Sequence, residues 1–126
     1  MAGTEQRHPA PKGLHASGRR LWRSIADQWQ LDEHESAILR EAARTVDLID
    51  QLHELAQADG LVIVGGRGGQ VSHPALAEAR QQRVVLARLL AVLRVPTGDE
   101  DDPAAGRRPQ RRAGARGTYG IQGVAR

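Results

Sequence analysis

Apolar residues recur at helical spacing in three segments of the chain, separated by two short breaks. The first segment runs from about Ser17 to Trp29, and its apolar stripe consists of Leu21, Trp22, Ile25 and Trp29. Ser17 stands where an N-cap residue would, because a serine hydroxyl can accept a backbone N–H of the first helical turn. The spacing therefore predicts a short N-terminal helix with one buried side.

A longer helix is predicted up to Asp59. Asp32, followed three residues later by Glu35, forms the pattern of a capping box, and Gly60 marks the end. One face is apolar along the whole segment, at Ile38, Ala42, Val46, Ile49, Leu52 and Ala56. The acidic residues Asp47, Asp50 and Glu54 are predicted to lie on the other side, toward water.

The third apolar segment predicts a helix that is capped by Ser72 or His73, has Pro74 in its first turn and ends near Arg94, before Pro96. Its second half, VVLARLLAVL, is apolar on nearly every side, whereas a surface helix needs only one apolar stripe. We therefore expect this helix to contact another subunit as well. The candidate self-association residues are Val85, Leu86, Leu89, Leu90, Val92 and Leu93.

The stretch LVIVGGRGGQVSHPAL, residues 61–76, has the order strand, glycine loop, helix that phosphate-binding loops share. A Walker loop needs a lysine directly after the glycines, but the only lysine is Lys12. The dinucleotide fingerprint G-x-G-x-x-G fits Gly66 and Gly68, and then fails because Val71 occupies the third position. Two short strands joined by a glycine loop, a β-hairpin, agree better with the residues present.

These elements predict a mainly α fold: a short N-terminal helix, a long antiparallel helical hairpin with a small β-hairpin at its tip, and a disordered C-terminal tail. Residues 1–13 are interpreted as a flexible arm, residues 14–96 as the helical domain, and residues 97–126 as the tail. The tail is rich in Gly, Ala, Pro and Arg and has no helical or strand periodicity. Within it, Tyr119 and Ile121 form a small patch that is a candidate for docking on a partner.

The net charge of +3 conceals a strong segregation of charge along the chain. Residues 1–31 have a net charge of +3, residues 33–59 one of −5, and residues 74–94 one of +3. The tail is acidic at residues 99–102 and basic afterwards. Such segregation suits either a polyanionic partner at the basic surfaces or charge pairing between copies.

The candidate DNA-contacting residues are Lys12, Arg19, Arg20, Arg23, Arg67, Arg107, Arg108, Arg111 and Arg112. The alternative for each residue is that it contacts no DNA and only lies in water, on a helix flank, in a turn or in the tail.

Candidate catalytic chemistry is scarce in the sequence. There is no cysteine, and the five histidines lack the spacing of metal ligands. No residues suggest a nucleophile with its base, so we expect no enzymatic activity, no cofactor and no metal. The chain also lacks a run of eighteen apolar residues and a signal sequence, and we expect neither a membrane location nor a membrane partner.

The order of these features resembles the small subunit of tailed-phage terminases. The residues that carry the resemblance are the Leu-Trp pair (Leu21, Trp22), L-D-E-H-E at residues 31–35, the long helix ending at Asp59-Gly60, and a short apolar strand with a glycine turn. The resemblance also includes HPAL at residues 73–76, which opens a helix containing Arg80. The resemblance covers about residues 10–96. Relatives often continue with a Pro-Ser-Ser/Ala-Arg run, whereas this chain continues with VPTGDEDD.

The resemblance implies a non-enzymatic DNA-packaging factor of the host cytoplasm. Such a protein forms an oligomeric ring, binds double-stranded DNA at the genome packaging site, and recruits and regulates the large terminase subunit, which is the ATPase and nuclease. The alternative is a self-associating adaptor or assembly scaffold without direct DNA binding. Binding to duplex DNA at low salt distinguishes the two hypotheses.

Overall fold

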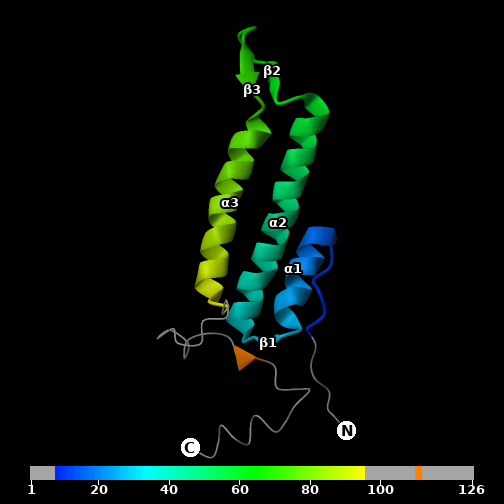
Figure 1. Cartoon of the computed structure of the whole chain (residues 1–126), viewed down its shortest axis with the longest axis vertical. Helices are drawn as coiled ribbons and strands as arrows, with labels where there is room; N and C mark the ends of the chain where they lie inside the picture. Colours follow the sequence, from blue (N-terminus) through cyan, green and yellow to red (C-terminus); the bar gives the residue numbers. More distant parts are fainter. Residues whose placement is uncertain (1–7, 96–109, 112–126) are drawn as a thin grey trace, which may run out of the picture.

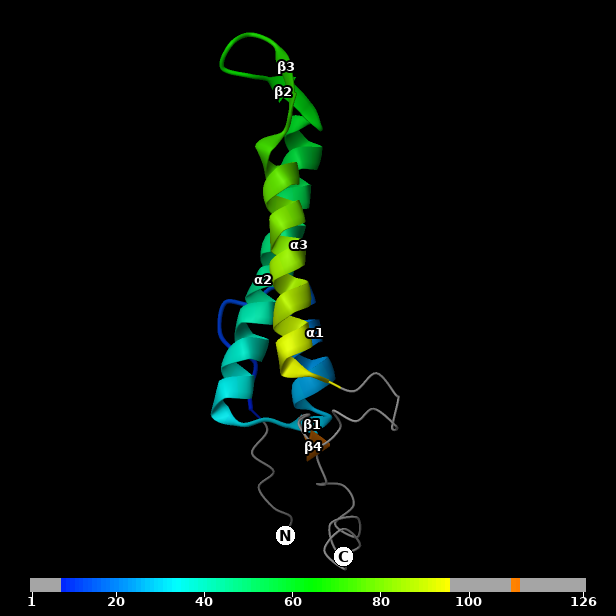
Figure 2. The ribbon, with the colours of Figure 1, turned by 90° about the vertical axis from the view of Figure 1, so that its left-hand side faces the viewer.

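The computed structural model describes residues 8–95 and 110–111. Its elements are α1 (Ala16–Ala26), β1 (Trp29–Gln30), α2 (Glu33–Asp59), β2 (Val62–Val64), β3 (Gln70–Ser72), α3 (Pro74–Leu93) and β4 (Gln110–Arg111). Helices α2 and α3 pack antiparallel along their lengths (Figures 1 and 2). Strands β2 and β3 project beyond one end of this pair, and α1 packs beside α2 at the other end. The predicted mainly α fold with a helical hairpin is confirmed.

Helix α2 begins and ends where its sequence signals predicted. The Asp32 carboxylate accepts the backbone N–H of Glu35, and the Glu35 carboxylate accepts the backbone N–H of Asp32, which completes the capping box. At the other end Gly60 has a φ of 95°, a backbone conformation that side-chain-bearing residues rarely adopt. The 27 residues between these caps form one uninterrupted helix, about 40 Å long at 1.5 Å per residue.

The glycine stretch forms the predicted β-hairpin. Strands β2 and β3 pair antiparallel, with Ile63 opposite Val71 at the centre of the register. Two backbone hydrogen bonds close the turn, from Gly65 N–H to the Gly69 carbonyl (2.7 Å) and from Gly68 N–H to the Gly65 carbonyl (3.0 Å). Gly68 has a φ of 84°, so the turn requires a glycine there. The glycines therefore form a turn between two strands.

His73 connects the hairpin to α3. Its Nδ1 accepts the Ala75 backbone N–H at 3.0 Å, and its Nε2 lies 2.9 Å from the Asp59 Oδ2 at the end of α2. Because Nδ1 accepts, Nε2 carries the hydrogen and donates to the carboxylate. Of the two predicted caps, His73 is the one used, and Pro74 follows in the first turn.

Helix α1 differs from its prediction at both ends. It begins at Ala16 with His15 in the N-cap position, and it ends at Ala26, so Trp29 belongs to strand β1 and not to the helix. Ser17 does not cap α1; its hydroxyl donates to the Asp50 carboxylate of α2. The prediction of a Ser17 cap was wrong because a side chain from another helix, Asp47, occupies that role.

Asp47 is buried between α1 and α2, with 5% of its surface exposed. Its Oδ1 accepts the Gly18 backbone N–H and its Oδ2 accepts the His15 backbone N–H, each at 2.7 Å. One carboxylate thus satisfies two N–H groups at the start of α1 and places a negative charge at the positive end of the helix. The prediction that Asp47 faces water was wrong.

The core lies at the α1 end of the molecule. Its buried members come from all three helices and the loops beside them: Leu14, Trp22, Ile25, Ala26, Leu31, Leu39, Ala43 and Leu93. The Trp22 indole N–H donates to the His8 carbonyl at 3.0 Å, and Ala10 packs against the core. Residues 8–13, which were expected to belong to a flexible arm, are therefore in part packed on the helical domain.

Strand β4 pairs antiparallel with β1, with Trp29 opposite Arg111 and Gln30 opposite Gln110. Residues 110–111 fall within the tail that was expected to be disordered, and this pairing was not predicted. The other predictions for residues 97–126, including those for Arg107, Arg108, Arg112, Tyr119 and Ile121, lie outside the described residues. Among the described helices, none has the length and apolar character needed to cross a bilayer.

Candidate nucleic-acid interface

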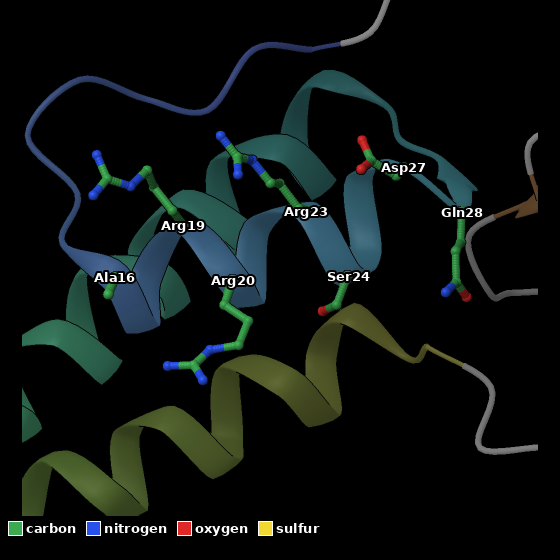
Figure 3. Close-up of a pocket in the computed structure, with 7 residues that line it drawn as sticks. All are labelled: Ala16, Arg19, Arg20, Arg23, Ser24, Asp27 and Gln28. Carbon is green, nitrogen blue, oxygen red and sulfur yellow. The ribbon is translucent and has the colours of Figure 1, made fainter.

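Three arginines predicted to contact DNA lie on the exposed side of α1. Arg19, Arg20 and Arg23 are all exposed, and Figure 3 shows them around the outside of the helix. Arg19 and Arg23 lie one turn apart and extend to the same side of α1, whereas Arg20 extends to the side where α3 lies. We call these three residues the arginine face.

The arginine face borders a shallow depression of about 600 Å³ on the outside of α1. The depression is lined by Ala16, Arg19, Arg20, Arg23, Ser24, Asp27 and Gln28. It is open to solvent and its lining comes from a single helix and the turn after it, whereas small-molecule sites are mostly enclosed and apolar. The shape suits the backbone of an extended polyanion better than a small ligand.

Contacts on the opposite side of α1 hold the arginine face in place. Trp22 and Ile25 are buried in the core, and Gly18 faces α2 so closely that an added Cβ would lie 2.7 Å from the Ala43 carbonyl oxygen. The two bonds from Asp47 fix the first turn of α1. A helix anchored this way presents its outer side chains from a rigid backbone, which lowers the entropic cost of binding.

Among the described residues, no acid neutralises the positive charges of the arginine face. Within residues 8–95, no carboxylate lies within ion-pair distance of Arg19, Arg20 or Arg23, and Arg20 has only a 3.4 Å contact with the Ser17 hydroxyl. On α2, by contrast, Arg44 forms an ion pair with Glu41 at 2.7 Å. The guanidinium groups of the arginine face thus have no carboxylate partner in the described part of the chain, and each can form two hydrogen bonds to a phosphate.

The other predicted DNA-contacting residues are dispersed. Lys12 is exposed in the segment that leads into α1. Arg67 is exposed at the tip of the β-hairpin, at the far end of the α2–α3 pair. For Arg111 the structure gives the backbone pairing in β4. The structure thus brings together Arg19, Arg20 and Arg23 around one depression, and Lys12 and Arg67 are not part of its lining.

The six candidate self-association residues of α3 divide into three groups. Leu93 is 2% exposed and belongs to the core of the chain itself, so it is not accessible to a second copy. Leu86, Leu89 and Leu90 are half-buried, and Leu90 packs against the core. Val85 and Val92 are exposed and remain accessible. Sequence reasoning had treated all six alike because it had no information on the core that Leu93 shares with α1, α2 and the neighbouring loops.

Asp47 is the residue of this site that sequence reasoning missed. An aspartate among other acids on a long helix usually lies on the solvated face. The sequence indicates the contact near Asp47 only indirectly, because Gly18, Ala42 and Ala43 are small residues that permit two helices to approach closely. Only the packing of α1 on α2 shows that an acceptor is needed there.

Asp32, His34 and Glu35 form the one group in the described part of the chain whose side chains converge closely enough to hold a metal ion, within 4.8 Å of one another. The Asp32 and Glu35 carboxylates are already used as acceptors in the capping box of α2. The convergence is therefore explained by the start of the helix.

Comparisons of the chain with known protein families, with curated proteins and with solved structures found no match.

Proposed function

We propose that this chain is a non-enzymatic DNA-packaging factor of the terminase small-subunit type, and that it binds duplex DNA through the arginine face of α1. The observation that carries the proposal is the arginine face itself: three exposed guanidinium groups without carboxylate partners among the described residues, on a helix fixed by buried contacts. Lys12 is exposed in the segment that leads into this helix.

The chemistry of the arginine face suits phosphate contacts. An arginine guanidinium is planar, always charged and matched to the two oxygens of a phosphate. Such contacts give affinity and position the protein on the duplex, and they carry no base sequence by themselves. An oligomer that places several arginine faces on one DNA molecule raises the affinity through avidity, and recognition of a packaging site needs base contacts in addition.

The wider role is proposed from the resemblance. The ordered features from Leu21 to Arg80 support an oligomeric ring that binds the packaging site in the host cytoplasm and recruits the large ATPase-nuclease subunit. The arrangement of α2 and α3 as a long antiparallel pair with exposed apolar residues agrees with self-association.

A salt titration of DNA binding tests the proposal. The test variant is R19Q/R23Q, and the matched control is R40Q/R44Q, which removes two arginines at the same spacing from α2, where both lie near Glu41. The slope of log K against log salt for duplex DNA is about −0.9 per phosphate contact, so R19Q/R23Q should lower its steepness by about 1.8 per protomer. The control should keep the wild-type slope.

Two results would contradict the DNA proposal. One is the absence of wild-type binding to duplex DNA at about 50 mM salt, where several phosphate contacts are readily detected. The other is an equal change of slope in both variants, since that would mean binding by net charge without a defined face.

The second candidate function is a self-associating adaptor or scaffold without direct DNA contact. The exposed apolar residues of the hairpin, Leu61, Val62 and Val64, favour it, because contiguous exposed apolar surface often marks protein contacts. The same titration separates the two functions, since an adaptor shows no salt-dependent affinity for DNA.

A further inference from the structure

Helix α2 has one side that no other part of the described chain covers. It contacts α3 with one side and α1 with a second, and the third side carries Leu48 and Leu55, which are 37% and 49% exposed. These two leucines are seven residues apart, so they lie two turns apart on one face, with the exposed Gln51 between them. We call Leu48, Gln51 and Leu55 the α2 outer face.

Helix α3 has a comparable uncovered side. Val84, Val85 and Val92 are 48%, 39% and 63% exposed, whereas Ala75, Ala79 and Leu93 on the other side are buried. The exposed Arg88 lies between the valines. We call Val84, Val85, Arg88 and Val92 the α3 outer face. Both helices of the pair therefore present large apolar side chains outward.

The two helices also differ in the sign of their exposed charges. The exposed acids of α2 are Glu33, Glu41, Asp50, Glu54 and Asp59, and Arg44, paired with Glu41, is its exposed base. The exposed arginines of α3 are Arg80, Arg83 and Arg88, and Glu78 is the exposed acid of that helix. Contact between two α3 helices would place arginines near arginines, and contact between two α2 helices would place acids near acids. Only contact of α3 with α2 brings opposite charges together.

The register of the hairpin brings the two outer faces to the same height where they overlap, at Leu48 of α2 and at Val84 and Val85 of α3. The contact between His53 Nε2 and Arg83 Nη1 (3.0 Å) and that between Asp59 and His73 fix α2 against α3. With this register, Leu48 lies level with residues 84–88 of α3, because both helices rise equally per residue. Two copies side by side in the same orientation thus bring Leu48 of one level with Val84 and Val85 of the other.

We propose that the α3 outer face of one copy packs against the α2 outer face of a second copy, in a head-to-tail arrangement. The contact repeats the antiparallel α2–α3 packing within each chain, so that α3 lies between the α2 helices of two copies. A row of copies joined head-to-tail has one unpaired outer face at each end until the row closes into a ring. The contact supplies the interface that the proposed oligomer needs, and it rests on that part of the proposed function and not on DNA binding.

Two charge-neutral variants test the arrangement. L48Q/L55Q changes only the α2 outer face, and V85Q/V92Q changes only the α3 outer face. All four side chains are exposed, so the fold should be kept, which circular dichroism checks. V62Q/V64Q in the hairpin is the matched control, since these valines are exposed but belong to neither face. Native mass spectrometry of the full chain at micromolar concentration gives the oligomeric state.

We expect the wild type and the hairpin control V62Q/V64Q to assemble. The two face variants, L48Q/L55Q and V85Q/V92Q, should each be monomeric. When the two face variants are mixed, the intact α3 face of one pairs with the intact α2 face of the other, which gives a 1:1 complex and nothing larger. A monomeric wild type overturns the inference. So does a face variant that still forms dimers alone, or loss of assembly in V62Q/V64Q. DNA titration of the same samples shows separately whether the proposed function holds.

Discussion

The two ends of the α2–α3 pair are stabilised in different ways. At the α1 end, Trp22, Leu39 and Leu93 come from three helices and are almost completely buried. At the hairpin end, Val62 and Val64 are exposed, and the strands are joined by backbone hydrogen bonds and a glycine turn. The α1 end therefore depends on contacts between residues far apart in sequence, and the hairpin end depends on local geometry.

This difference assigns separate roles to the two ends. The arginine face needs a rigid helix, and α1 is held by a core and by the buried Asp47. Regions with few buried contacts open at low free-energy cost, and the hairpin is such a region. Substitutions should therefore have large effects on stability at the α1 end and small effects at the hairpin.

The largest difference is expected between Trp22→Ala and Val64→Ala. Trp22 is 4% exposed and fills the core, so its truncation should lower the free energy of unfolding by about 3–5 kcal/mol. Val64 is 72% exposed, and its truncation should change that free energy by less than about 0.5 kcal/mol. Urea denaturation followed by far-UV circular dichroism measures both.

A loss of similar size in the two variants would mean that the ends do not differ as described. If V64A alone were strongly destabilised, the hairpin would be packed against another surface under the conditions of the measurement.

A smaller difference is expected between two glycines, Gly18 and Gly66. In Gly18→Ala the new Cβ would overlap the Asp47 carboxylate and the Ala43 carbonyl, so α1 must move away from α2. Although alanine favours helices, this overpacking should cost about 1–3 kcal/mol of unfolding free energy. Gly66→Ala meets no atom within 4 Å, and the lower entropy of its unfolded chain should leave stability unchanged or raise it slightly.

The urea midpoint of each glycine variant, at constant m-value, provides the measurement. Because α1 presents the arginine face, G18A should also weaken DNA binding, and G66A should not. Unchanged stability of G18A would contradict the close contact between α1 and α2.

The same contrast explains which features the sequence could predict. The capping box at Asp32, the turn at Gly68 and the start of α3 at Pro74 are local signals, and each appears where it was expected. The start of α1 depends on the acceptor Asp47, which is 29 residues from Gly18. No local pattern identifies such a partner.

The candidate site was predictable to a similar extent. Arg19, Arg20 and Arg23 were selected from charge alone, and in the structure all three are exposed and border one depression, with Arg20 on the side toward α3. Which leucines of α3 remain accessible could not be predicted, because Leu93 is buried in a core that α1, α2 and the neighbouring loops share, and Leu90 packs against that core. Periodicity shows that a helix has apolar sides, but not which neighbour covers each of them.

The smallest effect that should still be measurable concerns His73, where the hairpin joins α3. His73→Ala removes the acceptor of the Ala75 N–H and the hydrogen bond to Asp59, and the loss of one helix cap costs about 1 kcal/mol. Asp59→Asn is the control, because it changes only the partner of Nε2 and leaves the cap on Ala75. Hydrogen exchange should show faster exchange in residues 62–76 of H73A, with unchanged protection of α1. If protection of α1 fell as well, the two ends would unfold together and could not be treated as separate regions.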